Sequence, residues 1–324
     1  MVSLKTESIQ ADEPKIIAEI IESTIAGQEA TYKPGTVARR DVHSKSHGTV
    51  SGALTVLAQT PADCQVGLFA QPATYRALVR FSNGTPGVCR DAIPNVRGIA
   101  IKVLGVAGEK LLAGDEDADC VDFLLANHPI SFLRNLDDYP PIHDLLGQKK
   151  FGQVIRKYPR SARLLVRSMV KLVKNPLTIT YYSQTPYLLG DGRVVKYALV
   201  PKKKSSLFAV PNVFDAEYLR HAVENTLRTQ AAEFTLCVQF QEGTDPIEDP
   251  SQEWRGPFVP VAELVIEQRS NEPLLESDGE ALSFNPWRTL SEHRPLGWVN
   301  RVREAVYRAD FAWRTAKNAE YEIS

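Results

Sequence analysis

Cysteine is scarce in this sequence, and its spacing is typical of neither a metal site nor a disulfide framework. The four cysteines, Cys64, Cys89, Cys120 and Cys237, are widely separated and form no C-x-x-C pair. Zinc sites and small disulfide scaffolds need closely spaced or paired cysteines. We therefore expect four reduced thiols with mostly structural roles in a cytoplasmic protein.

Long apolar runs and a strong net charge are also missing. No stretch approaches the roughly 18 uncharged apolar residues that cross a bilayer, and residues 1–12 lack the apolar centre of a signal peptide. The formal net charge is −1, which provides no overall field to attract nucleic acid. These absences favour a soluble protein that binds no nucleic acid.

What the sequence does contain is the composition of a globular domain. Hydrophobic residues make up 43% and charged residues 24% of the 324 residues, close to the averages for folded proteins. A barrel with helical additions can use a length of this order as one unit. We expect a single domain over residues 1–324.

Hydrophobic patterns divide this domain into three parts. Residues 1–30 carry Ile16, Ile17 and Ile20 at helical spacing, which predicts an N-terminal helix. Residues 38–270 contain short β-rich runs in two groups around a helical insertion. These runs cover residues 50–58, 75–82, 98–104, 120–126, 194–200, 233–240 and 261–268. Residues 284–324 contain a predicted helix from 298 to 314.

The helical insertion covers residues 129–173, and a further helix is predicted over 215–229. We expect Pro140, Pro141 and Pro159 to end or kink helices. Seven or eight strands without regular βα alternation indicate an α+β protein, built on an antiparallel β-barrel with added helices.

The C-terminal helix carries a stripe of two arginines and a tyrosine. Arg303, Tyr307 and Arg314 stand at i, i+4 and i+11, which places them within about 40° of one another on a helix. A guanidinium beside a phenol favours the phenolate, which is a usable ligand for ferric iron. The alternative is a solvated helix face with an ordinary packed tyrosine.

Three earlier segments, in order along the chain, resemble motifs of the catalase family. Residues 40–46 (Arg-Asp-Val-His-Ser-Lys-Ser) are similar to the family's R-x-V-H-A-K-G. Residues 79–82 and 96–102 resemble its R-F-S and later D-x-R-G-x-A-x-K, with Asn95 in place of the aspartate. Residues 122–134 resemble the segment that ends in N-x-P-x-x-F-x-R. With the terminal R-x-x-x-Y, the chain resembles the short catalase-related proteins, including small peroxidases and allene oxide synthases.

This resemblance implies an eight-stranded antiparallel barrel that encloses haem b, with Tyr307 as the iron ligand. It implies that His43 lies above the haem and acts as general base and then general acid on the peroxide. Asn127 would hydrogen-bond the bound peroxide, and Ser82 would orient His43. The blander interpretations are a turn residue at a strand end for Asn127 and a strand-edge hydroxyl for Ser82.

The resemblance also implies which cations face the anionic groups of the cofactor. Arg40 and Arg80, with Arg314 as a partner on the tyrosine side, would meet the haem propionates and the tyrosinate. Val42 precedes the histidine as in catalases, whereas allene oxide synthases tend to have a threonine there, which can hydrogen-bond that histidine. Val42 therefore favours peroxide reduction.

The reaction expected from this resemblance is that of a haem-dependent peroxidase or catalase-like oxidoreductase. Its substrates would be hydrogen peroxide or an organic hydroperoxide, with a small-molecule electron donor. Two alternatives stay open: a fatty-acid hydroperoxide lyase or isomerase of the allene oxide synthase type, and a non-catalytic haem-binding protein. Because the long N-terminal arm and C-terminal extension of full-length catalases are missing, we expect a monomer or homodimer.

Two features stand outside the resemblance. Residues 156–174 carry seven basic side chains, with apolar ones interleaved at helical spacing. The favoured interpretation is an amphipathic helix that covers the core, and the alternative is contact with an anionic membrane surface. His47 stands at a predicted strand entry and is interpreted as structural.

Overall fold

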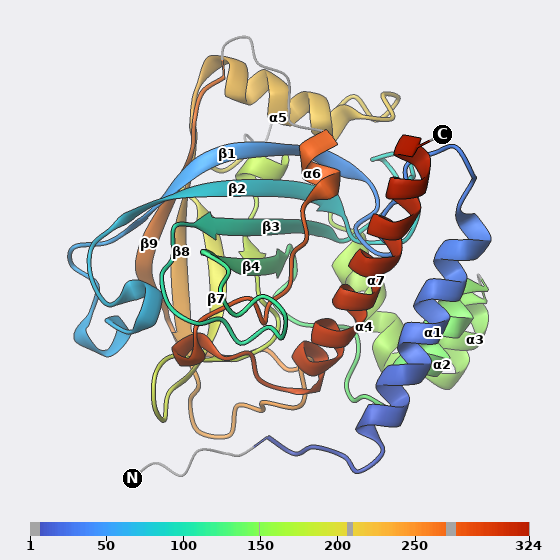
Figure 1. Cartoon of the computed structure of the whole chain (residues 1–324), viewed down its shortest axis with the longest axis horizontal. Helices are drawn as coiled ribbons and strands as arrows, with labels where there is room; N and C mark the ends of the chain where they lie inside the picture. Colours follow the sequence, from blue (N-terminus) through green and yellow to red (C-terminus); the bar gives the residue numbers. More distant parts are fainter. Residues whose placement is uncertain (1–6, 149, 206–209, 270–276, 324) are drawn as a thin grey trace.

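Eight antiparallel strands form a closed barrel. The computed structural model describes residues 7–148, 150–205, 210–269 and 277–323. Neighbouring strands follow the order β1, β2, β3, β4, β5, β7, β8 and β9, and β9 pairs again with β1. The short β6 (Tyr187–Leu188) is added at β7. The barrel strands are β1 (Ser46–Val56), β2 (Thr74–Asn83), β3 (Arg97–Leu104), β4 (Cys120–Ala126), β5 (Tyr181–Tyr182), β7 (Val194–Pro201), β8 (Ala232–Phe240) and β9 (Phe258–Ile266) (Figure 1).

The barrel closes around one apolar core. Side chains on a strand alternate between its two faces, and β1 buries Val50, Leu54 and Val56 at alternate positions. Val79 and Phe81 do the same on the adjoining β2. Burial of these side chains on one face fixes the register of each strand pair, since a shift by one residue would expose them.

Seven α-helices surround the barrel in the described part of the chain (Figure 1). α1 and α7 lie side by side next to the barrel, α2 to α4 follow β4, and α5 crosses another side. Their bounds are α1 (Glu13–Thr31), α2 (Tyr139–Gly147), α3 (Phe151–Lys157), α4 (Pro159–Met169), α5 (Tyr218–Thr229), α6 (Ser277–Ala281) and α7 (Trp298–Ile323). Short 3₁₀ helices cover Ala62–Cys64, Gly67–Phe69, Pro176–Thr178 and Ser291–His293.

A second apolar core joins the helices to one another. Ile20 of α1, Ile142 of α2 and Val302 of α7 are buried in it, together with Trp298 at the start of α7. A buried ion pair adds to the contact, since Arg301 Nη2 lies 2.9 Å from the Glu13 carboxylate. These contacts fix α7 against α1 and so determine where the residues of α7 point.

The structure confirms the predicted α+β class and the antiparallel eight-stranded barrel. The expectation for the prolines was partly wrong. Pro140 and Pro141 do not end a helix but lie in the first turn of α2, where the missing N–H would have no partner anyway. Pro159 begins α4 and separates it from α3.

The predicted ranges 1–30, 38–270 and 284–324 include residues 1–6, 270 and 324, which lie outside the described residues. The predicted N-terminal helix begins later than residue 1, because α1 starts at Glu13 with Pro14 in its first turn. The C-terminal helix extends past Arg314 to Ile323. No helix among the described residues is long and apolar enough to cross a membrane.

Candidate functional site

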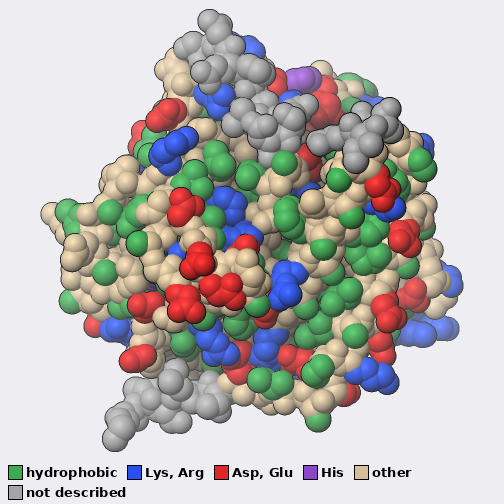
Figure 2. Space-filling view, in the orientation of Figure 1, with side chains coloured by type: hydrophobic (Ala, Val, Ile, Leu, Met, Phe, Trp, Pro, Cys, Tyr) green, Lys and Arg blue, Asp and Glu red, His purple; other side chains and the backbone are tan. Residues whose placement is uncertain are grey.

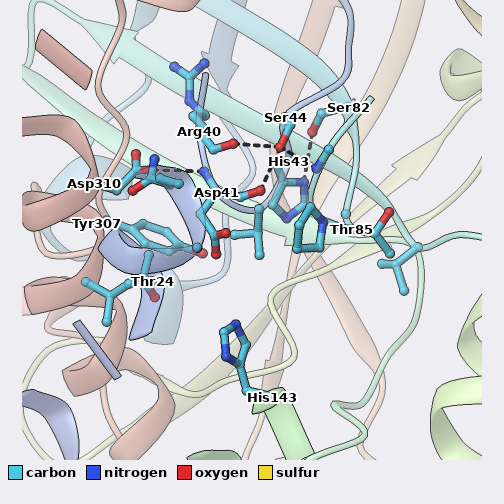
Figure 3. Close-up of a pocket in the computed structure, with 18 of the residues that line it drawn as sticks. Thr24, Arg40, Asp41, His43, Ser44, Ser82, Thr85, His143, Tyr307 and Asp310 are labelled. Carbon is cyan, nitrogen blue, oxygen red and sulfur yellow. Dashed lines mark hydrogen bonds between the residues drawn. The ribbon is translucent and has the colours of Figure 1, made fainter. Parts of the chain in front are cut away.

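A large cavity lies between the barrel and the helices. Its volume is about 1330 Å³, above the usual range for small-molecule sites. Strands β2, β3 and β4 contribute one side of the lining, and α1, α2, α4 and α7 contribute the other. Figure 3 shows side chains from the segment before β1 and from α7 directed into it.

His43 enters the cavity from the turn that precedes β1. Its φ is +60°, in the left-handed region that residues other than glycine seldom adopt. The Ser82 hydroxyl lies 2.9 Å from His43 Nδ1, and Arg80 donates to the His43 carbonyl at 3.0 Å (Figure 3). Since Ser82 occupies Nδ1, the ring nitrogen left for a ligand is Nε2.

The backbone of β3 lies directly against the His43 ring at Gly98. A Cβ built at residue 98 would come within 2.3 Å of His43 Cε1, so this position requires glycine. The hydrogen bond between Nδ1 and the Ser82 hydroxyl and the close approach of Gly98 together determine the orientation of the ring. With Nδ1–H as the donor to Ser82, Nε2 carries a free lone pair.

The surroundings of His43 keep its imidazole neutral. Burial, followed by the positive charges of Arg80, Arg303 and Arg40, lowers the pKa of His43 from 6.5 to about 3. His43 is therefore unprotonated at neutral pH. A neutral imidazole can accept a proton, whereas an imidazolium cannot.

Tyr307 lines the same cavity from α7 (Figure 3). Within the described residues its hydroxyl makes no hydrogen bond. The stripe on α7 led us to expect a hydrogen bond from Arg303, one turn earlier, to this phenol, but the structure has none. The Arg303 guanidinium lies instead 3.3 Å from the Thr185 hydroxyl and 3.5 Å from Asn300 Oδ1. The Tyr307 oxygen is thus left available to a ligand.

Three arginines converge on Glu280 beside the cavity, two on its carboxylate and one on its backbone carbonyl. Arg40 Nη1 and Arg80 Nη2 donate to the two Glu280 carboxylate oxygens at 2.9 and 2.7 Å. Arg314 donates to the Glu280 backbone carbonyl at 2.8 Å and to Asp310 Oδ2 at 3.0 Å. The three predicted arginines are therefore adjacent, although they come from three distant parts of the chain.

The charges in this arginine cluster act strongly on one another. Burial, and next the charge of Arg80, lowers the pKa of Arg40 to about 9. Burial would raise the pKa of Glu280, but Arg80 and Arg40 outweigh it and hold the pKa below its ordinary value. One carboxylate balances one of three cations, and Asp310 a second, which leaves the cluster able to accept a further anion.

Asn127 lies just beyond the end of β4 and is buried. Its Oδ1 accepts from the Arg97 backbone N–H at 2.8 Å, whereas Nδ2 is buried with no partner among the described residues. Asn127 does not belong to the cavity lining, unlike the adjacent Ala126. The structure therefore brings His43, Ser82, Val42, Tyr307 and the four arginines to one cavity and leaves Asn127 at its edge.

Asp41 and Glu280 belong to this site without having been predicted from the sequence. Asp41 lines the cavity, and burial, followed by the nearby charge of Asp310, raises its pKa to about 6. Glu280 lies on the short α6, in a polar segment that carries no motif. The sequence signal for Asp41 was its place within the motif of residues 40–46, two residues before His43. Glu280 had no such signal.

The residues around the cavity fit a haem. The Tyr307 phenol has no competing partner among the described residues, His43 is neutral, and the arginine cluster can meet carboxylates. Among the residues that the structure describes, no group of three or more His, Cys, Asp and Glu side chains could hold a metal ion. An iron carried by a macrocycle needs only one axial ligand from the protein.

Comparison with solved structures shows a catalase-like fold. A fungal catalase aligns with a TM-score of 0.66 and 18% identity over 97% of this chain and 65% of its own length. A bacterial catalase aligns with a TM-score of 0.64 and 18% identity, over 97% of this chain and 63% of its own length. Catalase A from Saccharomyces cerevisiae aligns with a TM-score of 0.61 and 17% identity, over 92% of this chain and 63% of its own length. The chain thus spans less than two thirds of each of these catalases. No protein-family model matches the sequence, and no curated protein sequence matches it.

Proposed function

We propose that this protein is a haem-dependent peroxidase or catalase-like oxidoreductase that acts on hydrogen peroxide or organic hydroperoxides. The observation that carries the proposal is the neutral His43, held by Ser82 in the same cavity as the unpartnered Tyr307 phenol. Tyr307 would bind the iron of haem b through its phenol oxygen. Arg40, Arg80 and Arg314 would pair with the propionates of the haem.

The protein residues supply proton transfer and orientation. A bound haem would supply the iron that accepts a peroxide oxygen and the electrons that cleave the O–O bond. His43 Nε2 takes the proton from the first peroxide oxygen and returns it to the second, which leaves as water or an alcohol. Ser82 holds the ring in place. The donation to the peroxide proposed for Asn127 requires its Nδ2–H to turn into the cavity, since Asn127 is not part of the lining. A small-molecule donor would supply the two electrons, together with two protons, that complete the reduction of the peroxide to two waters, or of a hydroperoxide to an alcohol and water.

The same residues would also serve a fatty-acid hydroperoxide lyase or isomerase, or a protein that binds haem without turnover. Val42 lines the cavity beside His43 and has no hydroxyl with which to bond the imidazole, which supports peroxide reduction. Oxygen release, donor oxidation and fatty-acid hydroperoxide consumption, measured on one haem-loaded preparation, separate the three functions. Oxygen release and donor oxidation support the proposal, whereas isomerised or cleaved lipid alone contradicts it.

The absorption spectrum tests the axial ligand. We expect haem-loaded protein to give a ferric high-spin spectrum of the phenolate-ligated kind, and Tyr307→Phe to lose it because the axial oxygen is gone. Tyr139 is a matched control, since its ring lines the same cavity and burial raises the pKa of its phenol. Tyr139→Phe should keep the parent spectrum. An unchanged spectrum in Tyr307→Phe would exclude it as ligand.

The pH dependence of peroxide cleavage tests the state of His43. With its pKa lowered to about 3, the base is neutral from pH 8 to 5, so the rate should stay level as pH falls. An imidazole with the ordinary value of 6.5 would be about 30-fold less available at pH 5. Stopped-flow spectra of the haem-loaded protein give the rate. A fall in the cleavage rate with a midpoint near pH 6.5 would contradict a neutral His43 over this range. Asp41→Asn is the control, because a fall that disappears in this variant comes from the neighbouring carboxyl and not from His43.

A further inference from the structure

A continuous stretch of the chain carries basic residues and no acidic ones. Between Asp144 and Asp191 there are nine lysines and arginines and no aspartate or glutamate, in a protein whose net charge is −1. α3, α4 and the segment after α4 fall within this stretch. Such separation of charge provides a local positive surface that the overall charge conceals.

Seven of these cations are exposed and have no carboxylate partner among the described residues. Two of the seven are set aside, because Lys150 precedes α3 and Arg160 donates to the Ser251 hydroxyl at 3.2 Å. Five remain on α3, α4 and the segment after α4. They are Arg156, Lys157, Arg163, Arg167 and Lys171. Figure 2 shows Lys and Arg side chains, with Asp and Glu side chains among them, at the edge of the molecule where α1 lies in front of α3 in Figure 1. Unpaired, solvated cations on adjoining helices remain free to meet an external anionic surface.

The same surface exposes large apolar side chains. Five of the thirteen described large hydrophobic residues that are exposed lie on α3, α4 and the segment after α4, namely Phe151, Ile155, Val166, Val170 and Leu172. Five more lie in two neighbouring loops, namely Val88, Ile93, Val210, Val213 and Phe214. A hydrogen bond from Arg90 to the Phe214 carbonyl at 2.6 Å joins the two loops to each other. Tyr218, at the start of α5 directly after the second loop, donates to the Val173 carbonyl in the segment after α4 at 2.9 Å.

α4 leaves part of its apolar surface exposed, although Ala162 is buried in the helical core and Leu165 and Met169 are half-buried. The helix buries Ser161, Ala162 and Ser168, whereas Val166 and Val170 are 55% and 62% exposed. The predicted amphipathic helix thus covers the core with part of its apolar surface and leaves Val166 and Val170 in solvent. Exposing valines beside arginines has a cost in water, which a surface both apolar and anionic would offset.

The cavity opens onto this docking face, defined by the five cations and the ten apolar residues above. Val88 and Phe151 are exposed and also line the cavity. Leu165 and Met169 line it from the inner side of α4. An apolar molecule could therefore pass from a surface in contact with the docking face into the cavity without crossing bulk water.

We propose that the docking face binds the surface of an anionic lipid membrane, with its apolar side chains among the acyl chains and its cations at the headgroups. Resting on the proposed function, the substrates taken this way are hydroperoxides of membrane lipids or of their fatty acids. The match of charge and apolar surface selects a membrane over a soluble polyanion, which would meet the cations only.

Vesicle flotation of the full chain tests the docking without haem chemistry. Vesicles of phosphatidylcholine with phosphatidylglycerol should bind the protein, vesicles of phosphatidylcholine alone should not, and added salt should weaken binding because it screens the charges. Arg163→Glu with Arg167→Glu should weaken binding by more than about tenfold. Arg76→Glu with Arg228→Glu makes the same charge change on exposed residues outside the face and should have a much smaller effect.

The apolar part is tested by Val166→Ser with Val170→Ser, which keeps every charge. Weaker vesicle binding with unchanged heparin binding supports a membrane site. Equal binding of parent and serine variant, or binding to heparin but not to vesicles, overturns the proposal in favour of a polyanion site. The haem spectrum, measured on the same variants, should be unchanged, so a failure of docking is distinguishable from a failure of the proposed haem function.

Discussion

His43→Ala is expected to slow peroxide O–O cleavage by about 10²- to 10⁴-fold, the usual contribution of a positioned general base and acid. The alanine variant has no group that can take a proton from one oxygen and deliver it to the other. Haem binding should persist, because Tyr307, Arg80 and Arg314 belong to other elements and Arg40 keeps its contact with Glu280. Single-turnover stopped-flow spectra with hydrogen peroxide measure the cleavage rate directly.

Two variants make this result specific to His43. Ser82→Ala removes only the hydroxyl 2.9 Å from Nδ1 and should cost roughly tenfold, since the ring keeps its base but loses part of its orientation. His143 also lines the cavity, on α2, and His143→Ala should leave the rate unchanged. A loss of rate in His143→Ala as large as that in His43→Ala would contradict the assignment of the proton transfer to His43.

The arginines link cofactor binding to the chemistry of His43. Arg80, Arg303 and Arg40 all act to lower its pKa, after burial itself. Two of them, Arg40 and Arg80, are proposed to meet the propionates, whose negative charge would offset part of their effect. The pKa of His43 should therefore rise on haem loading yet stay below its ordinary value, because burial remains. The base becomes stronger while it stays neutral at physiological pH.

Much of the fold and part of the site could be predicted because the relevant signals are local. Residues 120–126 were predicted as a strand and form β4 over the same bounds. The order of the motifs brought His43 and Tyr307 into one hypothesis, although most of the chain separates them. The cavity that both residues line agrees with that hypothesis.

What the sequence could not show depends on contacts between distant residues. Glu280 meets Arg80 across 200 positions and Arg40 across 240, and no local pattern marks such a pair. β5 closes the barrel with only two residues, too few for any alternation to be visible. The exposure of Val166 also depends on how α4 packs against its neighbours, which its helical spacing leaves open.

Asp122 is expected to be the costliest single charge to remove. Its carboxylate is fully buried, lies 2.7 Å from Lys102 Nζ, accepts from Arg288, and accepts the Asn285 backbone N–H at 3.0 Å. The side-chain amide of Asn285 in turn donates through Nδ2 to the Glu304 backbone carbonyl of α7 at 3.0 Å. Asp122 thus connects β4 to the segment that carries the Tyr307 helix.

Asp122→Asn should lower the free energy of unfolding by about 3–5 kcal/mol, because it leaves buried cations without their counter-ion. Urea unfolding followed by circular dichroism measures this loss. Asp115→Asn is the matched control: Asp115 also pairs with Arg288, but its side chain is 38% exposed, so its removal should cost under about 1 kcal/mol. Equal losses in the two variants would mean that burial does not set the cost. A larger loss for Asp122→Asn, with weaker haem retention in the folded variant, would mean that this carboxylate holds α7 in the position that Tyr307 requires.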